Sequence, residues 1–580
     1  MQRPVRQSSL LDDYTWAHQP SVSVLGWDGR LHNREELSWR LDTRLSGDTG
    51  DEALARVAYE RWGIHGLGEL VGDWSVVIGD DRSRSIVLAS DFAGARPLHY
   101  ARQGDTVLWS HDVEALAARL GDGDILDETY VAAFMMWGAC PGRTPYPGIE
   151  TVVPGQAVKI GAKGRTRHYL WRPPVDDVVE YADERRYDEQ LRALFRDAVA
   201  VRMQGDAPVV AELSGGLDSS SVVGMAHELI RTGAVRTPRL HTVSYLHRTS
   251  DDRRFIEEAE AAYAIDGVHI ATEDHPLVSE TGIGDEAMPA GWVSLHAAAA
   301  DVARRVSARA FLTGQNGDLI MGNWRDDSLQ VAGALRRGRL WRASRESIAW
   351  SRVLRVPAAS VLRHGVGALL PAALAPIGTY AAERHWIPTN ADTSLVPEFL
   401  ERIGMDNPMR LFSDDWKNAP PERRKHFLAL TVARELLTFR RPEPLLEFDY
   451  THPFTHRPLV EFLLSLPAHV LCRPGEPRRL MRRALQDLWP SGLKTRRSKS
   501  LFAAPWFYAL RPLAHRLLQA SRWHVVERGW VNRASLRTRL ERLTHGLECN
   551  EPQLRQIILL EHWLRHRAED RSGETMPRAV

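Results

Sequence analysis

Two glycines, an acid and three serines stand between an apolar run and a helix-like stretch in PVVAELSGGLDSSSVVGMA, residues 208–226. The first backbone N–H groups of a helix are unpaired and carry a partial positive charge, so they suit an anion. Gly215 and Gly216 let the backbone approach that anion, and Ser219–Ser221 add hydroxyl donors. Asp218 would repel a phosphate unless a cation lay between them. The segment therefore predicts a phosphate site that also holds a divalent metal.

A second acidic segment, AFLTGQNGDLIMGN at residues 310–323, again joins an apolar run to glycine-rich turns and an acid, Asp318. Mg²⁺ binds to proteins through one or two carboxylates together with phosphate oxygens. Asp218 and Asp318 are therefore the predicted ligands of a Mg²⁺ that bridges nucleotide phosphates. Taken alone, the first segment also fits a serine-capped strand–turn–helix, and the second fits an ordinary turn.

The first loop has no G-K-S or G-K-T sequence, so it is not a Walker A loop. It resembles the pyrophosphate loop of ATP pyrophosphatases, and the two segments in order resemble those of asparagine synthetases and β-lactam synthetases. The resemblance implies ATP and Mg²⁺ as cofactors, and cleavage of ATP between its α and β phosphates. The residues that it assigns to ATP and pyrophosphate binding are Leu213, Ser214, Gly215, Gly216, Asp218, Ser219, Ser220, Val243, Gly314 and Gln315.

A basic segment near the C-terminal end, LKTRRSKSLFAAPW at residues 493–506, carries a further candidate. Lys499 falls where the resembling families place a lysine that neutralises charge on the phosphates. A buried cation there would stabilise the transition state of adenylation and later the oxyanion of amide formation. The alternative is a solvated basic run, because Arg496 and Arg497 stand close to the lysine.

Two glutamates are candidates for deprotonating an attacking amine. Glu435 stands late in the helical segment ERRKHFLALTVARELLTFRR, roughly where β-lactam synthetases carry the glutamate of their catalytic dyad. Glu447 precedes Pro453 as in the asparagine synthetase pattern. Either glutamate could instead be a surface charge. Gln315 cannot act as a base, although those families carry an acid or a tyrosine at its position.

The segment LEFDYTHPFTHRPLVEFLLSLP, residues 446–467, resembles the substrate side of the same families around its Pro-Phe pair. Its histidines, His452 and His456, could suggest zinc, which proteins bind through three or four ligands at regular spacing. No third ligand follows at such a spacing. We therefore do not expect a zinc site in this segment.

The N-terminal third resembles the glutaminase domain of class II amidotransferases. Five segments carry the resemblance in order: GWDGRLHNREEL, GDWSVVIGDD, DFAGARPLHY, WSHDVEAL and YPGIETVVPGQ. That domain normally starts, after the initiator Met, with a cysteine whose thiolate is the nucleophile and whose α-amine is the base. Position 2 is Gln2 here, and the first cysteine is Cys140. We therefore expect a degenerate domain without glutaminase activity, or else an unrelated β domain.

The order of these segments in a chain too long for one core predicts two main parts. We expect residues 1–178 to form an α+β, Ntn-type domain like that of class II amidotransferases. We expect residues 183–580 to form an α/β synthetase domain of the ATP-pyrophosphatase type with a helical C-terminal portion. The stretch WRPPVDD at residues 171–177 is typical of a linker. The amphipathic segment at residues 183–204 predicts the helix that opens the second domain.

Composition narrows the class of protein further. The 580 residues carry a net charge of +1, which gives no overall electrostatic reason to expect nucleic acid. Three distant cysteines, and an N-terminus without an apolar core, fit a reducing cytoplasm. Residues 365–382 are uncharged and about long enough to span a bilayer, but two prolines favour a buried or surface-docking segment.

Without glutaminase chemistry, the nucleophile must be an amine on the substrate. Among the resembling families, lasso peptide macrolactam cyclases fit best, because of the chain length and an Arg- and Trp-rich stretch at about 324–420 that could bind a peptide. Their reaction adenylates an Asp or Glu side chain of a precursor peptide and closes an isopeptide ring with its N-terminal amine, releasing AMP and pyrophosphate. The implied partners are that peptide, a leader peptidase and a leader-binding protein. The alternatives are a β-lactam synthetase, another amine-using amide synthetase, and a non-catalytic nucleotide-binding scaffold.

Overall fold

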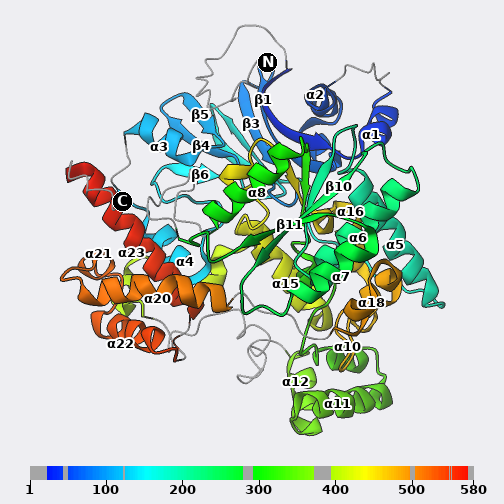
Figure 1. Cartoon of the computed structure of the whole chain (residues 1–580). Helices are drawn as coiled ribbons and strands as arrows, with labels where there is room; N and C mark the ends of the chain where they lie inside the picture. The colour runs from blue at the N-terminus through cyan, green and yellow to red at the C-terminus, as the bar shows by residue number, and fades with distance from the viewer. Residues whose placement is uncertain are drawn as a thin grey trace.

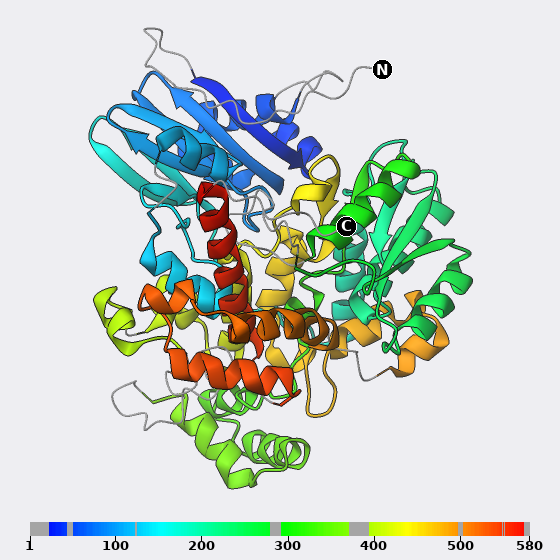
Figure 2. The same cartoon turned by 60° about the vertical axis from the view of Figure 1, so that its left-hand side comes forward.

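The computed structural model places two antiparallel sheets in the N-terminal third of the chain and one parallel sheet, flanked by helices, in the middle (Figures 1 and 2). This is the predicted arrangement of an Ntn-type α+β part, an α/β synthetase part and a helical C-terminal portion. The structure describes residues 22–42, 50–121, 125–278, 292–370, 394–405, 407–496, 503–547, 549 and 551–572.

The N-terminal part contains a five-stranded sheet of order β1-β2-β3-β7-β8 and a three-stranded sheet of order β5-β4-β6, with every neighbouring pair antiparallel. The strands are β1 (Val22–Leu31), β2 (Gly72–Asp80), β3 (Ser85–Ser90), β4 (His99–Gln103), β5 (Thr106–Ser110), β6 (Ile149–Thr151), β7 (Gln156–Gly161) and β8 (Gly164–Tyr169). The helices are α1 (Arg34–Arg40), α2 (Asp51–Trp62), the 3₁₀ helix η1 (Gly63–Glu69), α3 (Val113–Leu120) and α4 (Glu128–Trp137).

Strands β2 and β3 lie between two apolar layers, because successive side chains point to opposite faces of a sheet. Trp74 and Ile78 of β2 pack in one core with Leu54 of α2. Val77 packs in another core with Tyr100 of the small sheet. The nearly continuous apolar runs in these two strands thus mark strands that are covered on both faces.

The second part is built on a five-stranded parallel sheet of order β11-β10-β9-β12-β13. The strands are β9 (Val209–Glu212), β10 (Leu240–Leu246), β11 (Gly267–Ala271), β12 (Ala310–Leu312) and β13 (Asp449–Thr451). The helices beside the sheet are α5 (Arg185–Ala200), α6 (Leu217–Arg231), α7 (Arg253–Tyr263) and α8 (Val293–Arg305). Val209 packs with Phe195 of α5 on one face, and Val210 packs with Leu295 of α8 on the other. Consecutive residues of β9 therefore face opposite helical layers, as in other α/β folds.

Helices dominate the rest of the chain. They are α9 (Gly317–Ile320), α10 (Gln330–Arg336), α11 (Leu340–Leu354), α12 (Ala358–Gly367), α14 (Pro397–Arg402), η3 (Pro408–Leu411), η4 (Asp415–Asn418), α15 (Pro421–Glu435), η5 (Glu443–Leu445), η6 (Pro453–Thr455), α16 (Arg457–Ser465), α17 (Ala468–Leu471), α18 (Arg479–Leu485), η7 (Gln486–Leu488), α19 (Ser491–Thr495), α20 (Ala503–Gln519), α21 (His524–Glu527), α22 (Arg533–Thr544) and α23 (Glu551–Ser572). Helices α10, α11 and α12 pack on one another and project below the body in Figures 1 and 2. We call residues 330–370 the arm.

No helix within the described ranges is long and apolar enough to cross a membrane. The uncharged stretch at residues 365–382 begins in α12, whose last residue is Gly367. Residues 371–382 of that stretch lie outside the described ranges. The prediction that the stretch is buried or docks on a surface therefore stays a prediction.

A buried polar cluster joins the two parts of the molecule. Arg202, just after α5, has a side chain that is 1% exposed. Its Nε donates to Thr451 Oγ1 at 2.8 Å, and its Nη2 pairs with Asp73 of β2 at 3.3 Å. Burial alone would raise the pKa of Asp73, but Arg202 holds it below the usual range. Because removing one partner of a buried ion pair leaves an uncompensated charge, we expect the loss of either partner to weaken the contact between β2 and β13.

One helix of the N-terminal segment belongs to the core of the second part. Tyr130 and Phe134 of α4 share an apolar cluster with Ile557 of α23 and with β9 and β12. The predicted boundary at residue 178 divides the chain by its sequence motifs. By its packing, however, α4 belongs to the core of the synthetase part, although it precedes that boundary.

Candidate active site

Two loops at the carboxyl edge of the parallel sheet form the centre of the candidate site. One loop leads from β9 to α6, and the other leads from β12 to α9. Strands β9 and β12 are direct neighbours, with Leu312 opposite Ala211, so the two loops begin side by side. Open parallel sheets bind their ligands at this edge. The structure thus brings together the two acidic segments that the sequence singles out.

Glycines allow the two loops to touch. A Cβ on Gly314 would lie 2.5 Å from the backbone nitrogen of Ser219, and a Cβ on Gly317 would lie 2.5 Å from the Cγ of Asp218. Real Cβ atoms do not approach other atoms so closely. Gly215 adopts a φ of +66°, in the left-handed region that favours glycine. The structure therefore gives Gly314 a packing role, and its contact with a nucleotide stays a prediction.

The first loop is held in shape by its own serines. The backbone N–H of Ser214 donates to Ser219 Oγ at 3.1 Å, and the two hydroxyls lie 3.0 Å apart. Ser220 Oγ is buried without a hydrogen-bond partner in the described part of the chain. Helix α6 begins after Gly216, and no side chain caps its N-terminus. The first N–H groups of α6 are therefore oriented for an anion.

Arg478 joins the two predicted metal ligands. Its Nη2 donates to Asp218 Oδ2 at 2.8 Å and also forms an ion pair with Asp318. The Asp218 side chain is 8% exposed, and its Oδ1 has no hydrogen-bond partner among the described residues. The Asp318 side chain is 47% exposed and accepts a 3.0 Å bond from Asn323. Two carboxylates that converge on one cation, with a buried oxygen left over, fit a divalent metal that prefers oxygen ligands.

Arg478 is a functional candidate that the sequence analysis misses. It is 260 residues from Asp218 in the chain and precedes α18 with a φ of +55°, which is uncommon outside glycine. Its backbone N–H donates to the carbonyl of Gly322, next to the second loop, at 3.0 Å. No local pattern marks this arginine, because only the packing of α18 against the two loops brings it to the acids.

Two of the residues predicted to bind ATP lie beneath the first loop. The side chains of Leu213 and Val243 belong to the core, and the Leu213 N–H donates to the carbonyl of Val243 at 2.9 Å. The hydroxyl of Ser244 donates to the carbonyl of Leu213 at 2.7 Å. These bonds fix the point where the loop leaves β9. Contact of Leu213 or Val243 with a ligand stays a prediction.

Arg496 supports the first loop from the C-terminal side. Its side chain is 4% exposed, its Nη1 donates to the carbonyl of Gly215 at 2.8 Å, and its Nη2 pairs with Asp252. The interpretation of Arg496 as part of a solvated basic run is therefore wrong, because the residue is buried against the phosphate loop. Residues 497–502 lie outside the described ranges, so the role of Lys499 stays a prediction.

A chain of hydrogen bonds holds the second loop. The backbone N–H of Gln315 donates to Thr313 Oγ1 at 3.2 Å, and this hydroxyl lies 2.6 Å from His452 Nδ1. His452 Nε2 lies 3.1 Å from the carbonyl of Phe439, so Nε2 carries the proton and Nδ1 accepts. Burial lowers the pKa of His452 to about 4, which keeps the ring neutral. His452 thus positions the loop that carries Gln315.

The candidate base Glu435 lies close to this loop. It is buried at the end of α15 and accepts bonds from the backbone N–H of Ser413, at 3.0 Å, and from the hydroxyl of Ser413. Burial raises the pKa of Glu435. Three residues further on, the carbonyl of Thr438 accepts a 3.0 Å bond from Gln315 Nε2. The end of α15 therefore contacts the second loop through its backbone, three residues after Glu435, while the Glu435 carboxylate is bound to Ser413.

The other candidate base, Glu447, lies elsewhere. It precedes β13 and pairs with Arg304 of α8 at 2.6 Å, and both side chains are about half exposed. Strand β13 is parallel to β12, so a residue before β13 lies at the amino edge of the sheet. The two acidic loops lie at the opposite edge. The structure therefore does not bring Glu447 to the site. Its position fits the alternative interpretation, in which Glu447 is a surface charge.

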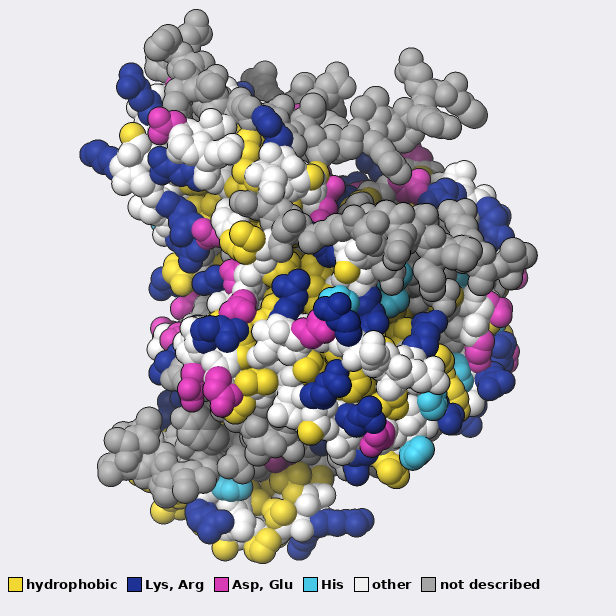
Figure 3. All heavy atoms as spheres, turned by 90° about the vertical axis from the view of Figure 1, so that its left-hand side faces the viewer, with side chains coloured by type: hydrophobic (Ala, Val, Ile, Leu, Met, Phe, Trp, Pro, Cys, Tyr) yellow, Lys and Arg dark blue, Asp and Glu magenta, His cyan; other side chains and the backbone are white. Residues whose placement is uncertain are grey.

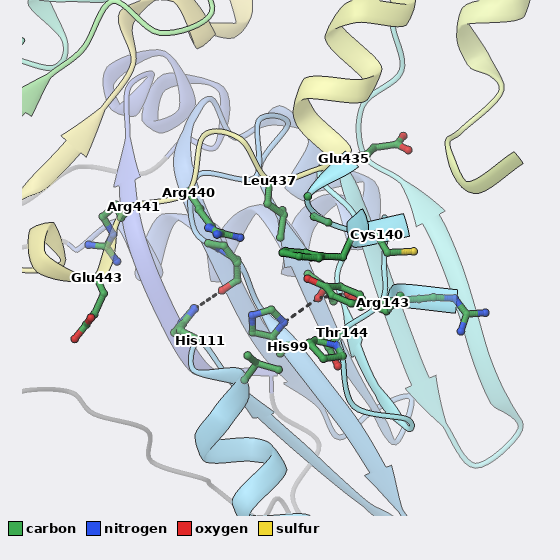
Figure 4. A pocket seen from close by; sticks show the side chains of 18 of the residues that line it. His99, His111, Cys140, Arg143, Thr144, Glu435, Leu437, Arg440, Arg441 and Glu443 are labelled. Carbon is green, nitrogen blue, oxygen red and sulfur yellow. Dashed lines mark hydrogen bonds between the residues drawn. The ribbon is translucent and has the colours of Figure 1, made fainter. Parts of the chain in front are cut away.

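A cavity of about 390 Å³ lies between the two parts of the molecule and reaches the end of α15 (Figure 4). Its charged and histidine side chains are Asp28, Arg96, His99, His111, Arg143, Glu435, Arg440, Arg441, Glu443 and Arg555. Its aromatic side chains are Tyr130, Phe134, Trp292 and Trp506. Five arginines against three acids give the wall an excess of positive charge. A pocket of this size suits a small molecule or the reacting segment of a larger one.

Individual groups in the cavity have defined charge states. His99 Nδ1 lies 2.8 Å from Thr151 Oγ1, and burial lowers the pKa of His99 to about 3, so the imidazole is neutral. Burial opposes the ionisation of Asp28, but Arg441 and Arg96 hold its pKa below the usual value. Figure 4 shows the carboxylate of Glu435 turned away from His99, in agreement with its bonds to Ser413.

Family models match both parts of the chain. The asparagine synthase family model matches residues 190–565, and the glutamine amidotransferase domain model matches residues 6–171. The chain is 27% identical over 208 residues to the glutamine-hydrolysing asparagine synthetase 3 of Bacillus subtilis (strain 168), covering 34% of this chain and 33% of that protein. It is 29% identical over 269 residues to the carboxyethyl-arginine beta-lactam-synthase of Streptomyces clavuligerus, covering 45% of each. The chain thus spans less than half the length of either relative.

A solved structure of glutamine phosphoribosylpyrophosphate amidotransferase from B. subtilis, complexed with ADP and GMP, aligns at 14% identity. The alignment covers 53% of this chain and 73% of that one with a TM-score of 0.20. A score this low carries no argument about the site.

Proposed function

The chain belongs to the asparagine synthase family, and we propose that it is an ATP-dependent amide ligase that takes its amine from the substrate itself. The proposed substrate is a precursor peptide, in which an Asp or Glu side chain is activated and joined to the N-terminal amine in a macrolactam ring, as in lasso peptide cyclases. The observation that carries the proposal is the meeting of Asp218 and Asp318 at one edge of the sheet, in a chain whose amidotransferase-like part has Gln2 in place of a cysteine.

The first loop is suited to the phosphates of ATP. The uncapped N–H groups at the start of α6 and the neighbouring hydroxyls of Ser214 and Ser219 are the proposed donors to these phosphates. Asp218 and Asp318 are the residues that would hold Mg²⁺, which supplies neutralising charge at the phosphates when it is bound. Arg478, already between the two acids, is then free to exchange a carboxylate for a phosphate oxygen as its partner.

The proposed reaction has two steps. The substrate carboxylate attacks the α-phosphorus of ATP, pyrophosphate leaves, and an acyl adenylate forms. The amine then attacks the acyl carbon, AMP leaves, and the amine loses a proton to a base. We propose that Lys499 stabilises the charge on the α-phosphate in both steps. We keep Glu435 as the candidate base, since its raised pKa suits proton transfer near neutral pH once it exchanges Ser413 for the amine.

We propose that the cavity lined by Glu435 holds the amine and the carboxyl group of the substrate close together. Holding two reacting groups in attack geometry is worth roughly 7–11 kcal/mol in favourable intramolecular cases. The N-terminal part contributes several of its polar groups, among them Asp28, Arg96 and His99. We propose that this part shapes the cavity and lacks catalytic chemistry of its own. The proposed partners of the whole protein are a leader peptidase and a leader-binding protein, and its proposed compartment is the cytoplasm.

A second candidate is a β-lactam synthetase or a related small-molecule amide synthetase. The similarity to the carboxyethyl-arginine beta-lactam-synthase favours it. The size of the cavity is compatible with a small substrate as well as with part of a peptide. The two candidates share the adenylation step and differ in whether the amine and the carboxyl belong to a peptide.

The proposal is tested by substrate-dependent exchange of labelled pyrophosphate into ATP, followed by mass analysis of the product. Peptides with a free N-terminal amine and an internal Asp or Glu are compared with small β-amino carboxylates. We expect exchange and AMP formation with a peptide, and a product lighter by one water. Exchange with small amino acids alone would replace the first candidate by the second. No exchange with any carboxylate would contradict the ligase assignment.

A further inference from the structure

The arm presents apolar side chains to solvent on a helix that also has a buried face. In α11, Ala343 and Trp350 pack inward against α10 and α12. Leu340 and Trp341 are 67% and 74% exposed, and Ile348 is 48% exposed. Since an α-helix turns about 100° per residue, these three exposed side chains lie within one sector of about 100°. Other exposed apolar residues of the arm are Val353, Val356, Val366, Leu369 and Leu370.

The arm is also strongly basic. Residues 330–370 contain eight arginines and one glutamate, a net charge of +7, so the remaining residues carry −6 of the chain's total of +1. Arg336 and Arg337 pair with Glu422, and Arg342 pairs with Glu346. The other five arginines are exposed and form no ion pair with any described residue: Arg339, Arg345, Arg352, Arg355 and Arg363.

Arginine and apolar side chains alternate on the same surface. The guanidinium carbon of Arg345 lies 5.1 Å from the centre of the Trp341 ring, one turn before it in α11. At the bottom of Figure 3, where the arm projects, yellow apolar side chains gather beside dark-blue basic ones. The arm is therefore neither a purely apolar docking face nor a solvated basic surface.

We propose that the arm docks the protein on an anionic membrane surface. Leu340, Trp341 and Ile348 enter the interface, and the unpaired arginines bind lipid phosphates. Helices that lie in membrane interfaces combine exposed Trp and aliphatic side chains with Arg or Lys, and basic clusters bind anionic leaflets. The charge of −6 on the rest of the chain is repelled by the same surface, so the arm also sets the orientation of the molecule.

Two other binding partners, a nucleic acid and an acidic protein, account for fewer of the exposed side chains of the arm. A nucleic acid would pair with the arginines and stack on Trp341, but would leave Leu340 and Ile348 in water. An acidic protein would concentrate its binding energy in a compact, fully desolvated centre. The apolar residues of the arm are instead spread along two helices and separated by arginines, which matches a lipid interface.

The test is cosedimentation of the full chain with vesicles of phosphatidylglycerol mixed with phosphatidylcholine, compared with phosphatidylcholine alone. We expect binding only to the anionic vesicles, weaker at high salt. The double substitution Arg345→Gln/Arg352→Gln should weaken binding by about fivefold for each arginine. Trp341→Ser should weaken it by at least about tenfold, through lost apolar burial.

The matched control is Arg231→Gln/Arg239→Gln, which removes two exposed arginines outside the arm that also form no ion pair with a described residue. All four arginines are exposed, so equal thermal unfolding temperatures should show that the variants fold. Loss of vesicle binding in the arm variants alone supports the proposal. Equal binding to both kinds of vesicle, or equal loss in the control, overturns it. So does an arm variant that loses affinity for a single-stranded oligonucleotide and keeps its affinity for vesicles.

Discussion

Two buried acids, one in each part of the molecule, are held in different ways. In the N-terminal part, the carboxylate of Asp91 accepts backbone N–H groups from residue 74 and from residues 93–95, at 2.6–3.2 Å. In the second part, the Asp218 carboxylate accepts a bond only from Arg478 among the described residues and leaves Oδ1 without a partner. The first acid is closed to any ligand, whereas the second has an oxygen to spare for one.

This difference is consistent with the proposed division into a supporting part and a reacting part. Asp73 in the N-terminal part is likewise fully engaged, with Arg202 and Thr451 of the synthetase part as its partners. Gln2 offers no nucleophile in place of the cysteine of active amidotransferase domains. We propose that the N-terminal part serves to pack against the second part, through groups such as Asp73, and does not itself react.

The largest effect is expected at the exposed metal ligand. Asp318→Ala should lower the rate of AMP formation about a thousandfold or more, because it removes a carboxylate that the metal and phosphates require. Glu447→Ala is the matched control, since Glu447 is also about half exposed and paired with an arginine, but lies at the other edge of the sheet. Its rate should stay near that of the wild type. A rate near that of the wild type in Asp318→Ala would refute the assignment of Asp318. A loss of activity in Glu447→Ala as large as that in Asp318→Ala would return Glu447 to the site.

A somewhat smaller effect is expected from the basic segment. Lys499→Ala should lower kcat by about 10²–10³-fold with KM nearly unchanged, because the lost cation acts on the transition state. Lys499→Arg should restore little, since a planar fork does not replace a compact charge. Arg496→Ala should instead weaken ATP binding and lower the unfolding temperature, because it frees the carbonyl of Gly215 and leaves Asp252 unpaired. Steady-state kinetics that show raised KM and intact kcat for Lys499→Ala would exclude its catalytic role.

Acid should destabilise the contact between the two parts. Burial lowers the pKa of His32 and His99 to about 3 and that of His452 to about 4, from 6.5 in the unfolded chain. Below pH 6.5 the unfolded chain therefore binds protons that the folded chain does not, and the free energy of unfolding falls until about pH 4. Burial raises the pKa of Asp91 to about 7, so protonation of Asp91 in acid favours the folded chain. The three histidines together outweigh this single group. Unfolding temperatures that stay constant or rise between pH 7 and pH 5 would be inconsistent with this.

The smallest effect is expected from glutamine. Addition of glutamine should release no glutamate above background, because Gln2 provides neither a thiolate nor the base of the N-terminal cysteine. Free ammonia and glutamine should both leave the rate of AMP formation with a peptide unchanged. Glutamate release, followed by chromatography, would show that the N-terminal part retains a reaction and would remove the contrast between the parts.

The centre of the site follows from the sequence because it depends on neighbouring elements. Two apolar runs, each followed by glycines and an acid, predict two strands of one parallel sheet, and the ends of adjacent strands meet. Gly215 and Asp218 are therefore correctly placed at one edge with Asp318. The α/β layers of the second part follow from the same alternation of strands and helices.

The remaining features depend on contacts that no local pattern contains. Arg478 reaches Asp218 only because α18 packs beside the loops, and its left-handed backbone gives no signal in the sequence. Glu447 is misplaced because distance along the chain from a Pro-Phe pair does not say on which edge of a sheet a residue lies. Arg496 looks solvated in a run of basic residues, yet Gly215 and Asp252 bury it. Long-range packing decides each of these cases.

The division of roles between the two parts is tested most directly by comparing Asp218→Asn with Asp73→Asn in both unfolding free energy and single-turnover AMP formation. Asp218→Asn should lower the rate of AMP formation about a thousandfold, no more than Asp318→Ala, because it weakens a metal ligand. Its stability should change little, because Arg478 keeps Asp318 as a partner. Asp73→Asn should cost about 3–5 kcal/mol of stability by leaving Arg202 uncompensated. Its folded fraction should still form AMP at nearly the wild-type rate. The opposite pattern, with activity lost in Asp73→Asn and stability lost in Asp218→Asn, would contradict the account.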